Sequence, residues 1–344
     1  MSKEKRVIYY DILNILAIIA VITMHCNGIV HGNPNTRAWN FSLIIECICY
    51  WAVPVFIMLS GANLLNYREK YDTKHFFKKR ILKVLIPFVF WALIMFIWKK
   101  CTGQINANLN SIKDYANFFL SNKEEPTYYF IFEILGIYLT MPLLSRLAKK
   151  EYRGTLWLTV GIFFVFNATI PNILGLFQIN WNSSFSVKIG GWIIYVIIGY
   201  LLSTQDLTKK QKAFIYIFAI VGLIYRYLTT FYLSKIAGTV VKTTWGYTSW
   251  HCILLASSVF LIVKDLKLSN LENNTIQNLI QKTSSCSLGI YLIHMIVRYY
   301  EINLLNINTA SWQFRTIGAI TTYLISLLIV YLLKKIPIVK KIVP

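Results

Sequence analysis

The chain contains ten apolar runs, and each is about as long as the hydrocarbon core of a membrane is thick. A transmembrane helix needs roughly 20 predominantly apolar residues, and a chain in lipid must satisfy its backbone hydrogen bonds within helices or a closed barrel. The sequence therefore predicts an all-α, polytopic integral membrane bundle of about ten transmembrane helices, organised as a single domain over residues 1–344. The runs lie near residues 8–28, 41–65, 81–98, 128–147, 155–174, 187–203, 213–233, 245–264, 284–303 and 313–333.

The distribution of charge fits a membrane protein and predicts its orientation. Only 14% of the residues are charged and 56% are hydrophobic, which is far from the composition of a soluble domain. The net charge of +21 would suggest a nucleic-acid partner in a soluble protein, but here the cations gather in short segments between apolar runs, and no nucleic-acid-binding module is visible. With a cytoplasmic N-terminus, 24 of the 35 lysines and arginines fall at inner segments and eight at outer ones. The positive-inside rule then predicts that both termini are cytoplasmic, in a multi-pass protein of the plasma membrane.

The six cysteines show no sign of metal or disulfide chemistry. They lie mostly within the apolar runs and lack the paired spacing of metal ligands. We expect small core residues, no disulfide framework and no metal site. The first apolar run follows a short basic lead without a small-residue cleavage site, which predicts a retained helix and not a removed signal peptide.

The first apolar run, Tyr9 to His25, carries polar residues on one face. At ~100° per residue, Asp11, Asn14 and His25 share a single stripe of a helix. Asn14 and His25 are about three turns, or ~16 Å, apart along the axis. Polar groups are costly in a membrane unless they face water or a partner, so this stripe predicts a functional path into the bilayer.

The fourth run carries Glu133 at helical spacing with Tyr129, Gly136 and Thr140. With the predicted orientation, this carboxyl group lies in the same outer half of the membrane as His25. A histidine or another cation favours the ionised form of a buried carboxylate, so the two groups are mutually useful. The spacing alone leaves open whether Glu133 and His25 touch.

Charged and polar groups recur in the seventh and ninth runs. Arg226 lies near the middle of the seventh run, where an arginine needs a carboxylate or a substrate as its partner; Glu46 and Glu133 are the candidates. The ninth run carries polar residues at the spacing i, i+3, i+7, i+10 and i+14, which places them in one continuous stripe. They are Ser284, Ser287, Tyr291, His294 and Arg298. Packing alone explains such a stripe poorly, and it predicts a lined cavity.

The second run contains Pro54 and the pair Ser60 and Gly61. Proline removes a backbone donor and bends a helix, whereas a small pair lets another helix approach closely. We expect a kinked packing helix here.

A cluster of four cations precedes the apolar part of the third run. It consists of Lys78, Lys79, Arg80 and Lys83. Attraction to anionic lipid headgroups is the ordinary explanation for such a cluster at an inner membrane surface. The alternative is a site for the phosphates of a nucleotide-bearing cofactor that approaches from the cytoplasm, for which arginine offers bidentate geometry.

These stretches, in this order, resemble the acyltransferase-3 family of integral membrane acyltransferases, and in particular its surface-polysaccharide O-acyltransferase branch. The matching stretches are YYDILNILAIIAVITMH, VPVFIMLSGANLL, FFKKRILKVLIPFVFW and SLGIYLIHMIV, with YYFIFEILGIYLTMPLL as a looser fifth. The family's first helix has a basic residue, ten further residues and then a histidine; here Asn14 stands at the basic position before His25. The family's Arg-x-x-Arg before the third helix appears as Arg80 and Lys83.

The resemblance implies transfer of an acetyl or other short acyl group from cytoplasmic acyl-CoA to a hydroxyl of a cell-surface or lipid-linked polysaccharide. It also implies that His25 acts as the general base or as the carrier of the acyl group, and that Glu133 orients its imidazole ring. The residues expected on the path of the acetyl-CoA donor are Asp11, Asn14, Lys79, Arg80 and Lys83. The residues expected on the acceptor side are Arg226, Tyr291 and His294. The expected partners are thus acyl-CoA, a glycan and the lipid bilayer, without nucleic acid, and homo-oligomerisation is left open.

Two other classes of protein remain open at this stage. A transporter or flippase of a lipid-linked or exported glycan would also need a polar path through a helical bundle. A membrane sensor or scaffold without chemistry would explain Asn14 in place of a basic residue, but the intact polar stripe of the ninth run speaks against it. A conservative change at His25 separates the first alternative from acyl transfer, because a transporter should tolerate it better.

Overall fold

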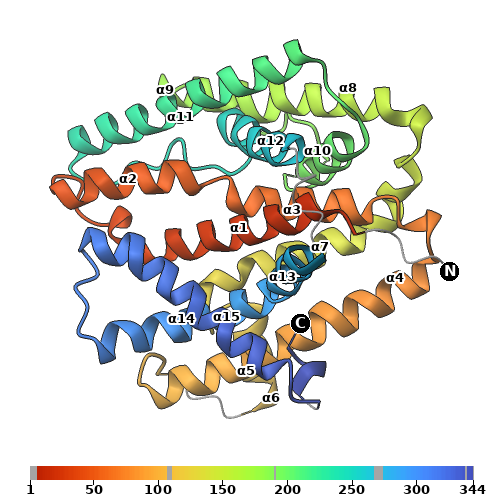
Figure 1. Ribbon diagram of the computed structural model, residues 1–344. Helices are drawn as coiled ribbons and strands as arrows, with labels where there is room; N and C mark the ends of the chain where they lie inside the picture. Colours follow the sequence, from red (N-terminus) through yellow and green to blue (C-terminus); the bar gives the residue numbers. More distant parts are fainter. Residues whose placement is uncertain (1–5, 107–110, 190, 267–273, 338, 344) are drawn as a thin grey trace.

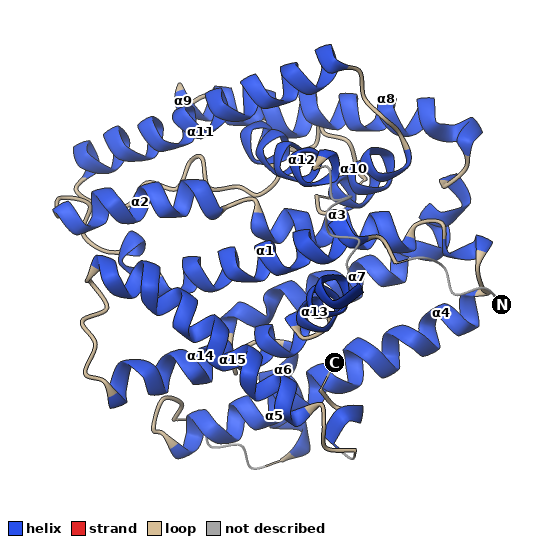
Figure 2. Cartoon of the chain, viewed as in Figure 1, coloured by secondary structure: helices blue, strands red, loops and turns tan. Residues whose placement is uncertain are grey.

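The computed structural model describes residues 6–106, 111–189, 191–266, 274–337 and 339–343, and all regular structure in these ranges is helical (Figures 1 and 2). The predicted all-α class is confirmed. The α-helices are α1 (Ile8–Cys26), α2 (Arg37–Cys49), α3 (Ala52–Leu64), α4 (Thr73–Arg80), α5 (Ile86–Cys101), α6 (Ile112–Leu120), α7 (Tyr129–Leu144), α8 (Arg153–Phe163), α9 (Ile170–Leu176), α10 (Ile193–Thr204), α11 (Lys209–Ala237), α12 (Trp250–Asp265), α13 (Asn274–Ser284), α14 (Ser287–Leu304) and α15 (Ala319–Leu333).

Seven helical stretches within the described residues are long and apolar enough to cross a membrane. They are Ile8–Cys26, Arg37–Glu69, Thr73–Cys101, Pro126–Leu147, Lys150–Leu176, Lys209–Ala237 and Phe314–Leu333. The other three predicted runs form α10, α12 and α14, which have 12, 16 and 18 residues. The chain is therefore a polytopic helical membrane protein, while the count of ten spans and the cytoplasmic termini stay predictions.

Helix α1 lies at the centre of the bundle (Figure 1). It packs against α2, α3, α12, α13, α14 and α15. Its side chains Leu13, Ala17 and Ile18 are completely buried. Because protein surrounds α1 on so many sides, its polar stripe faces other helices and the spaces between them, which is what intramembrane polar groups require.

The second predicted run is two helices and not one kinked helix. Helix α2 ends at Cys49 and α3 begins at Ala52, so Pro54 lies in the first turn of α3, where its missing N–H group costs no helical hydrogen bond. The predicted close approach at Gly61 is confirmed, because the carbonyl group of Val196 on α10 lies directly against its Cα.

A π-helical turn, Ile81–Leu85, joins α4 to α5 just before Pro87. Proline cannot donate a backbone hydrogen bond and its ring crowds the carbonyl four residues earlier, so a wider turn relieves the conflict. A second π turn, Phe164–Thr169, precedes Pro171 in the same way. The first of these turns carries the end of the basic cluster into the bundle.

The ninth predicted run is also interrupted. Helix α13 ends at Ser284 and α14 begins at Ser287. The polar stripe therefore crosses a break, and the backbone carbonyls at the end of α13 are free to accept hydrogen bonds from side chains.

Candidate functional site

A cavity of about 890 Å³ lies among α1, α3, α7 and the junction of α13 with α14. Four cationic side chains line one end, which we call the cavity mouth. They are Arg6, Lys70, Arg80 and Lys83. The aromatic side chains of Phe56, Phe130 and Tyr291 line the other end. The lining residues run from the mouth to the aromatic end with rising residue numbers on α1 and α14, and with falling numbers on α3 and α7. The cavity therefore lies between helices that run in opposite directions.

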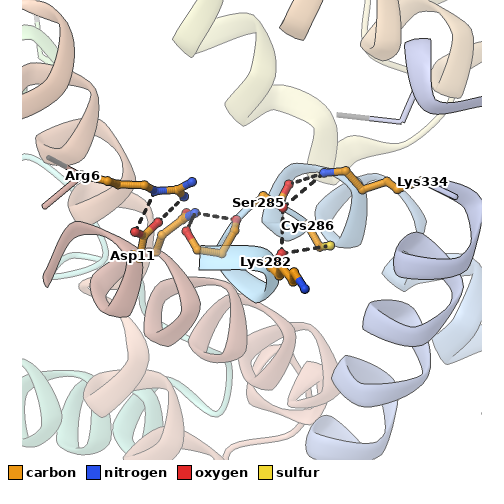
Figure 3. A network of polar contacts seen from close by, with 8 residues as sticks. Arg6, Asp11, Lys282, Ser285, Cys286 and Lys334 are labelled. Carbon is orange, nitrogen blue, oxygen red and sulfur yellow. Dashed lines mark hydrogen bonds and ion pairs between the residues drawn. The ribbon is translucent and has the colours of Figure 1, made fainter. Parts of the chain in front are cut away.

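The cavity mouth has a strong excess of positive charge. The Asp11 carboxylate accepts two hydrogen bonds from the Arg6 guanidinium, and that from Nε to Oδ2 is 2.8 Å long (Figure 3). Lys334, just beyond the end of α15, donates from Nζ to the carbonyl oxygen of Ser285 over 2.7 Å (Figure 3). Burial lowers the pKa of Lys334, and the nearby cations, Arg6 and Lys83 among them, lower it further. Neighbouring cations at the mouth destabilise one another's charged forms, and a bound polyanion would relieve this repulsion.

Asn14 connects α1 to the break between α13 and α14. Its Nδ2 lies 3.0 Å from both the carbonyl oxygen and the Oγ of Ser284. The side chain thus satisfies a carbonyl group at the end of α13 and lines the cavity at the same time. In this chain the position that is basic in the resembled family fixes a wall of the cavity.

Tyr291 closes the inner end of the cavity. Its hydroxyl group donates to the carbonyl oxygen of Thr127, and its ring lies 5.6 Å from that of Phe130, centroid to centroid. On its far side the ring of His294 lies 5.7 Å away. One aromatic side chain therefore separates the cavity from the first histidine.

His294 and His25 form a pair beyond that aromatic wall. Their ring centroids are 5.1 Å apart. His294 is completely buried, and its Nδ1 lies 2.6 Å from the carbonyl oxygen of Tyr291. A carbonyl oxygen only accepts, so Nδ1 carries the proton of the neutral ring, and Nε2, which has no partner among the described residues, carries the lone pair. The pair therefore contains a nitrogen that is ready to accept a proton or a hydrogen bond.

The structure does not bring Glu133 to His25. The Glu133 side chain is exposed on the outside of α7, and it forms no hydrogen bond or ion pair with any described residue. The face of α7 that lines the cavity carries Phe130 and Ile134 instead. The predicted partnership of Glu133 with His25 is therefore corrected, because the orientation of α7 leaves the Glu133 side chain exposed.

Of the predicted phosphate ligands, Arg80 and Lys83 line the cavity and Lys79 does not. The Lys79 ammonium lies 4.2 Å above the ring of Tyr71, on a different face of α4. Arg6 lines the mouth in its place, and Lys334 lies nearby through its hydrogen bond to Ser285. Neither belongs to the basic cluster of the third run, because both are far from it in the sequence and only the packing of α1 and α15 brings them near it.

Arg226 lies in a separate buried cluster. Its guanidinium carbon is 3.3 Å from the ring centroid of Tyr50, and its Nη2 is 3.9 Å from Glu46 Oε1. Of the two carboxylates expected as its partner, Glu46 is the one that the structure places there. The contacts of Arg226 among the described residues include neither Tyr291 nor His294, so of the three predicted acceptor-side residues Tyr291 and His294 contact each other and Arg226 lies apart.

The chain was also compared with known proteins. Neither the curated proteins nor the solved structures give a match. A family model described as an acyltransferase domain, that of the acyltransferase-3 family, matches residues 7–331. The match includes α1 with His25, the cavity and α14 with His294, and we conclude that the chain belongs to the acyltransferase-3 family and is a membrane acyltransferase.

Proposed function

We propose that the protein transfers an acetyl or other short acyl group from cytoplasmic acyl-CoA to a hydroxyl group of a cell-surface or lipid-linked polysaccharide at the plasma membrane. One observation carries the proposal. A deep cavity has cations at its mouth and ends one aromatic side chain short of the His25–His294 pair.

The cavity mouth suits the phosphates of coenzyme A. Arg80 and Lys83 offer the charge that the sequence predicted, and Arg6 adds a guanidinium that its ion pair with Asp11 holds in place. The pantetheine arm would then lie along α1 past Asn14, and its thioester would approach Tyr291. A cavity with cations at its mouth and aromatic side chains at its other end fits a donor that is anionic at one end and reactive at the other.

His25 is proposed as the residue that carries the reaction. A neutral imidazole removes the proton of the acceptor hydroxyl as its oxygen attacks the thioester carbonyl; the C–O bond forms, the C–S bond breaks and the proton passes to the leaving thiolate. In the alternative, a nitrogen of His25 first attacks the thioester carbonyl, the C–S bond breaks and the thiolate leaves as the thiol with the ring proton; the acceptor hydroxyl then takes the acyl group and returns its proton to the imidazole. His294 orients the pair in either case, because its Nδ1–H group is tied to the carbonyl of Tyr291.

The shape of the cavity supports transfer over glycan transport. A transport path has to pass a substrate across the bundle. At the aromatic end of this cavity, however, the rings of Phe130 and Tyr291 contact each other, and the Tyr291 hydroxyl group is bonded to the backbone at Thr127. A donor that delivers only its acyl group to this point does not need a continuous pore.

The test uses purified protein in lipid nanodiscs with acetyl-CoA labelled in its acetyl group. We expect CoA release and label on an added surface glycan, with succinyl-CoA as the second donor to try. Exchange of labelled CoA into acetyl-CoA without any acceptor would identify His25 as an acyl carrier, and its absence would favour a general base. If neither acyl-CoA is bound or consumed, the proposal is wrong, and glycan flux across sealed vesicles becomes the measurement of choice.

A further inference from the structure

A cationic and aromatic patch lies at the opposite end of α1 from the cavity mouth. It is built around Trp245 in the loop between α11 and α12, and we call it the Trp245 patch. The ring of His31 lies 5.4 Å from the Trp245 ring, the Lys242 ammonium 5.4 Å and the Arg226 guanidinium 5.6 Å. His31 and Lys242 are exposed, Trp245 is half-buried, and Arg226 is only 1% exposed beneath them. One indole ring thus gathers three groups that are cationic or can become so.

The positive charge of the patch is poorly matched by protein. Among the described residues, Glu46 provides the carboxylate that faces Arg226, and their 3.9 Å separation is an ion pair but too long for a hydrogen bond. The Nε and Nη2 atoms of Arg226 have no hydrogen-bond partner there, although both are buried. Partial burial and then the Lys242 ammonium lower the pKa of His31. A buried guanidinium without its full set of acceptors has capacity for an anion.

The patch adjoins the histidine pair. His25 lies in the last turn of α1, and His31 ends the 3₁₀ turn Gly28–His31 that follows this helix. Arg6 and Asp11 lie at the other end of α1, at the cavity mouth. The histidine pair therefore lies between a cavity on one side and the Trp245 patch on the other.

We propose that the Trp245 patch binds an anionic group of the acceptor, a carboxylate or a phosphate, and hence that the acceptor glycan is acidic. This inference rests on the proposed function. Guanidinium and ammonium groups pair with carboxylates and phosphates, and the indole ring offers an apolar face to the C–H groups of a sugar. In the predicted orientation the patch is external, where lysines and arginines are scarce and the positive-inside bias does not explain them.

The experiment measures binding of fluorescent oligosaccharides to the full chain in nanodiscs of neutral lipid. The main pair is a glucuronate-containing oligosaccharide and its carboxyl-reduced form, which differ only in charge. A glycerol-phosphate oligomer tests phosphate as the source of the anion. We expect at least one anionic ligand to bind about tenfold more tightly than the neutral one, with Lys242→Gln removing most of that difference and Lys242→Arg retaining it.

Lys100→Gln is the matched control, because it removes an exposed lysine from another outward position, near the end of α5. Equal binding of charged and neutral oligosaccharides would overturn the inference, and so would an equal effect of the Lys100 and Lys242 changes. Binding that appears only in nanodiscs of anionic lipid would show a lipid-binding surface and also overturn it. Binding of acetyl-CoA is measured in the same samples. If the protein does not bind acetyl-CoA, the proposed function is refuted. If it binds acetyl-CoA but does not prefer the anionic oligosaccharides over the neutral one, only the acidic acceptor is refuted.

Discussion

Helices α3 and α10 cross at two glycines, and this contact supports one wall of the cavity. A Cβ atom built on Gly61 would lie 2.0 Å from the carbonyl oxygen of Val196, and one on Gly199 would lie 2.0 Å from that of Met58. Both obstacles are backbone atoms, so no side-chain rotation relieves them. Replacing Gly61 with alanine must therefore push the two helices apart.

The size of the effect follows from the geometry. Ordinary contact of a Cβ atom begins at 3.4 Å, so the local separation has to grow by about 1.4 Å. Overpacking typically costs ~1–3 kcal/mol, and we expect Gly61→Ala to lie at the upper end because the clash is with backbone. A loss of ~3 kcal/mol should lower Tm by about 5 °C. Donor affinity should fall as well, since Phe56 and Leu59 of α3 line the cavity.

Thermal unfolding in detergent and acetyl-CoA binding in nanodiscs measure the two effects. Gly136→Ala on α7 is the control, because no atom lies within 4 Å of the added methyl group and alanine is favoured over glycine within a helix by ~0.5–1 kcal/mol. If Gly61→Ala melts at the same temperature as Gly136→Ala and binds the donor equally well, the described helix contact is wrong.

Three further perturbations test other parts of the account. Changing Arg80 and Lys83 together to glutamine should raise the KM for acetyl-CoA by tenfold or more, since each charged hydrogen bond contributes ~1.5–3 kcal/mol. The KM for acetyl-pantetheine, which lacks the nucleotide phosphates, should stay unaltered. Equal effects on both donors would show that the phosphates do not bind at the cavity mouth. Asn14→Ala should lower the free energy of unfolding by about 1–3 kcal/mol, because Ser284 loses its partner, and an unaltered melting curve would contradict this. Burial, reinforced by the neighbouring Glu125 carboxylate, raises the pKa of Glu124 from 4.5 to about 7, so the folded state holds this proton to higher pH than the unfolded state. The free energy of unfolding should therefore fall from pH 4.5 to 7 and level off above, and Glu124→Gln should abolish this fall. Parallel pH profiles of the melting temperature in the two proteins would contradict this.

The course of the chain was largely predictable from its sequence, because apolar runs of membrane length have few alternatives to helix. The small pair at Ser60 and Gly61 also signalled close packing correctly. Breaks within runs were harder to foresee. Pro54 predicted a bend, but the helix ends a few residues earlier, and nothing at Ser285 marks the break between α13 and α14.

The candidate site was predictable in its residue types and less so in its pairings. His25 and His294 each stood out as intramembrane histidines, yet their contact depends on how α1 and α14 pack. Glu133 shares a helix face with Gly136, and that face is exposed, whereas the buried face of α7 carries apolar residues. Helical spacing defines which residues share a face, but only tertiary packing decides which face meets the site.

The central claim is that His25, reached from the cavity, carries the acyl transfer, and label transfer in three proteins tests it. Wild type, His25→Ala and Glu133→Gln are compared in nanodiscs with labelled acetyl-CoA and an acceptor glycan, after matched melting curves show that all three are folded. The account predicts that His25→Ala loses turnover by ~10²–10⁴-fold, as expected for a general base, while Glu133→Gln retains it. Turnover that survives in His25→Ala would contradict the account, whatever the result for Glu133→Gln.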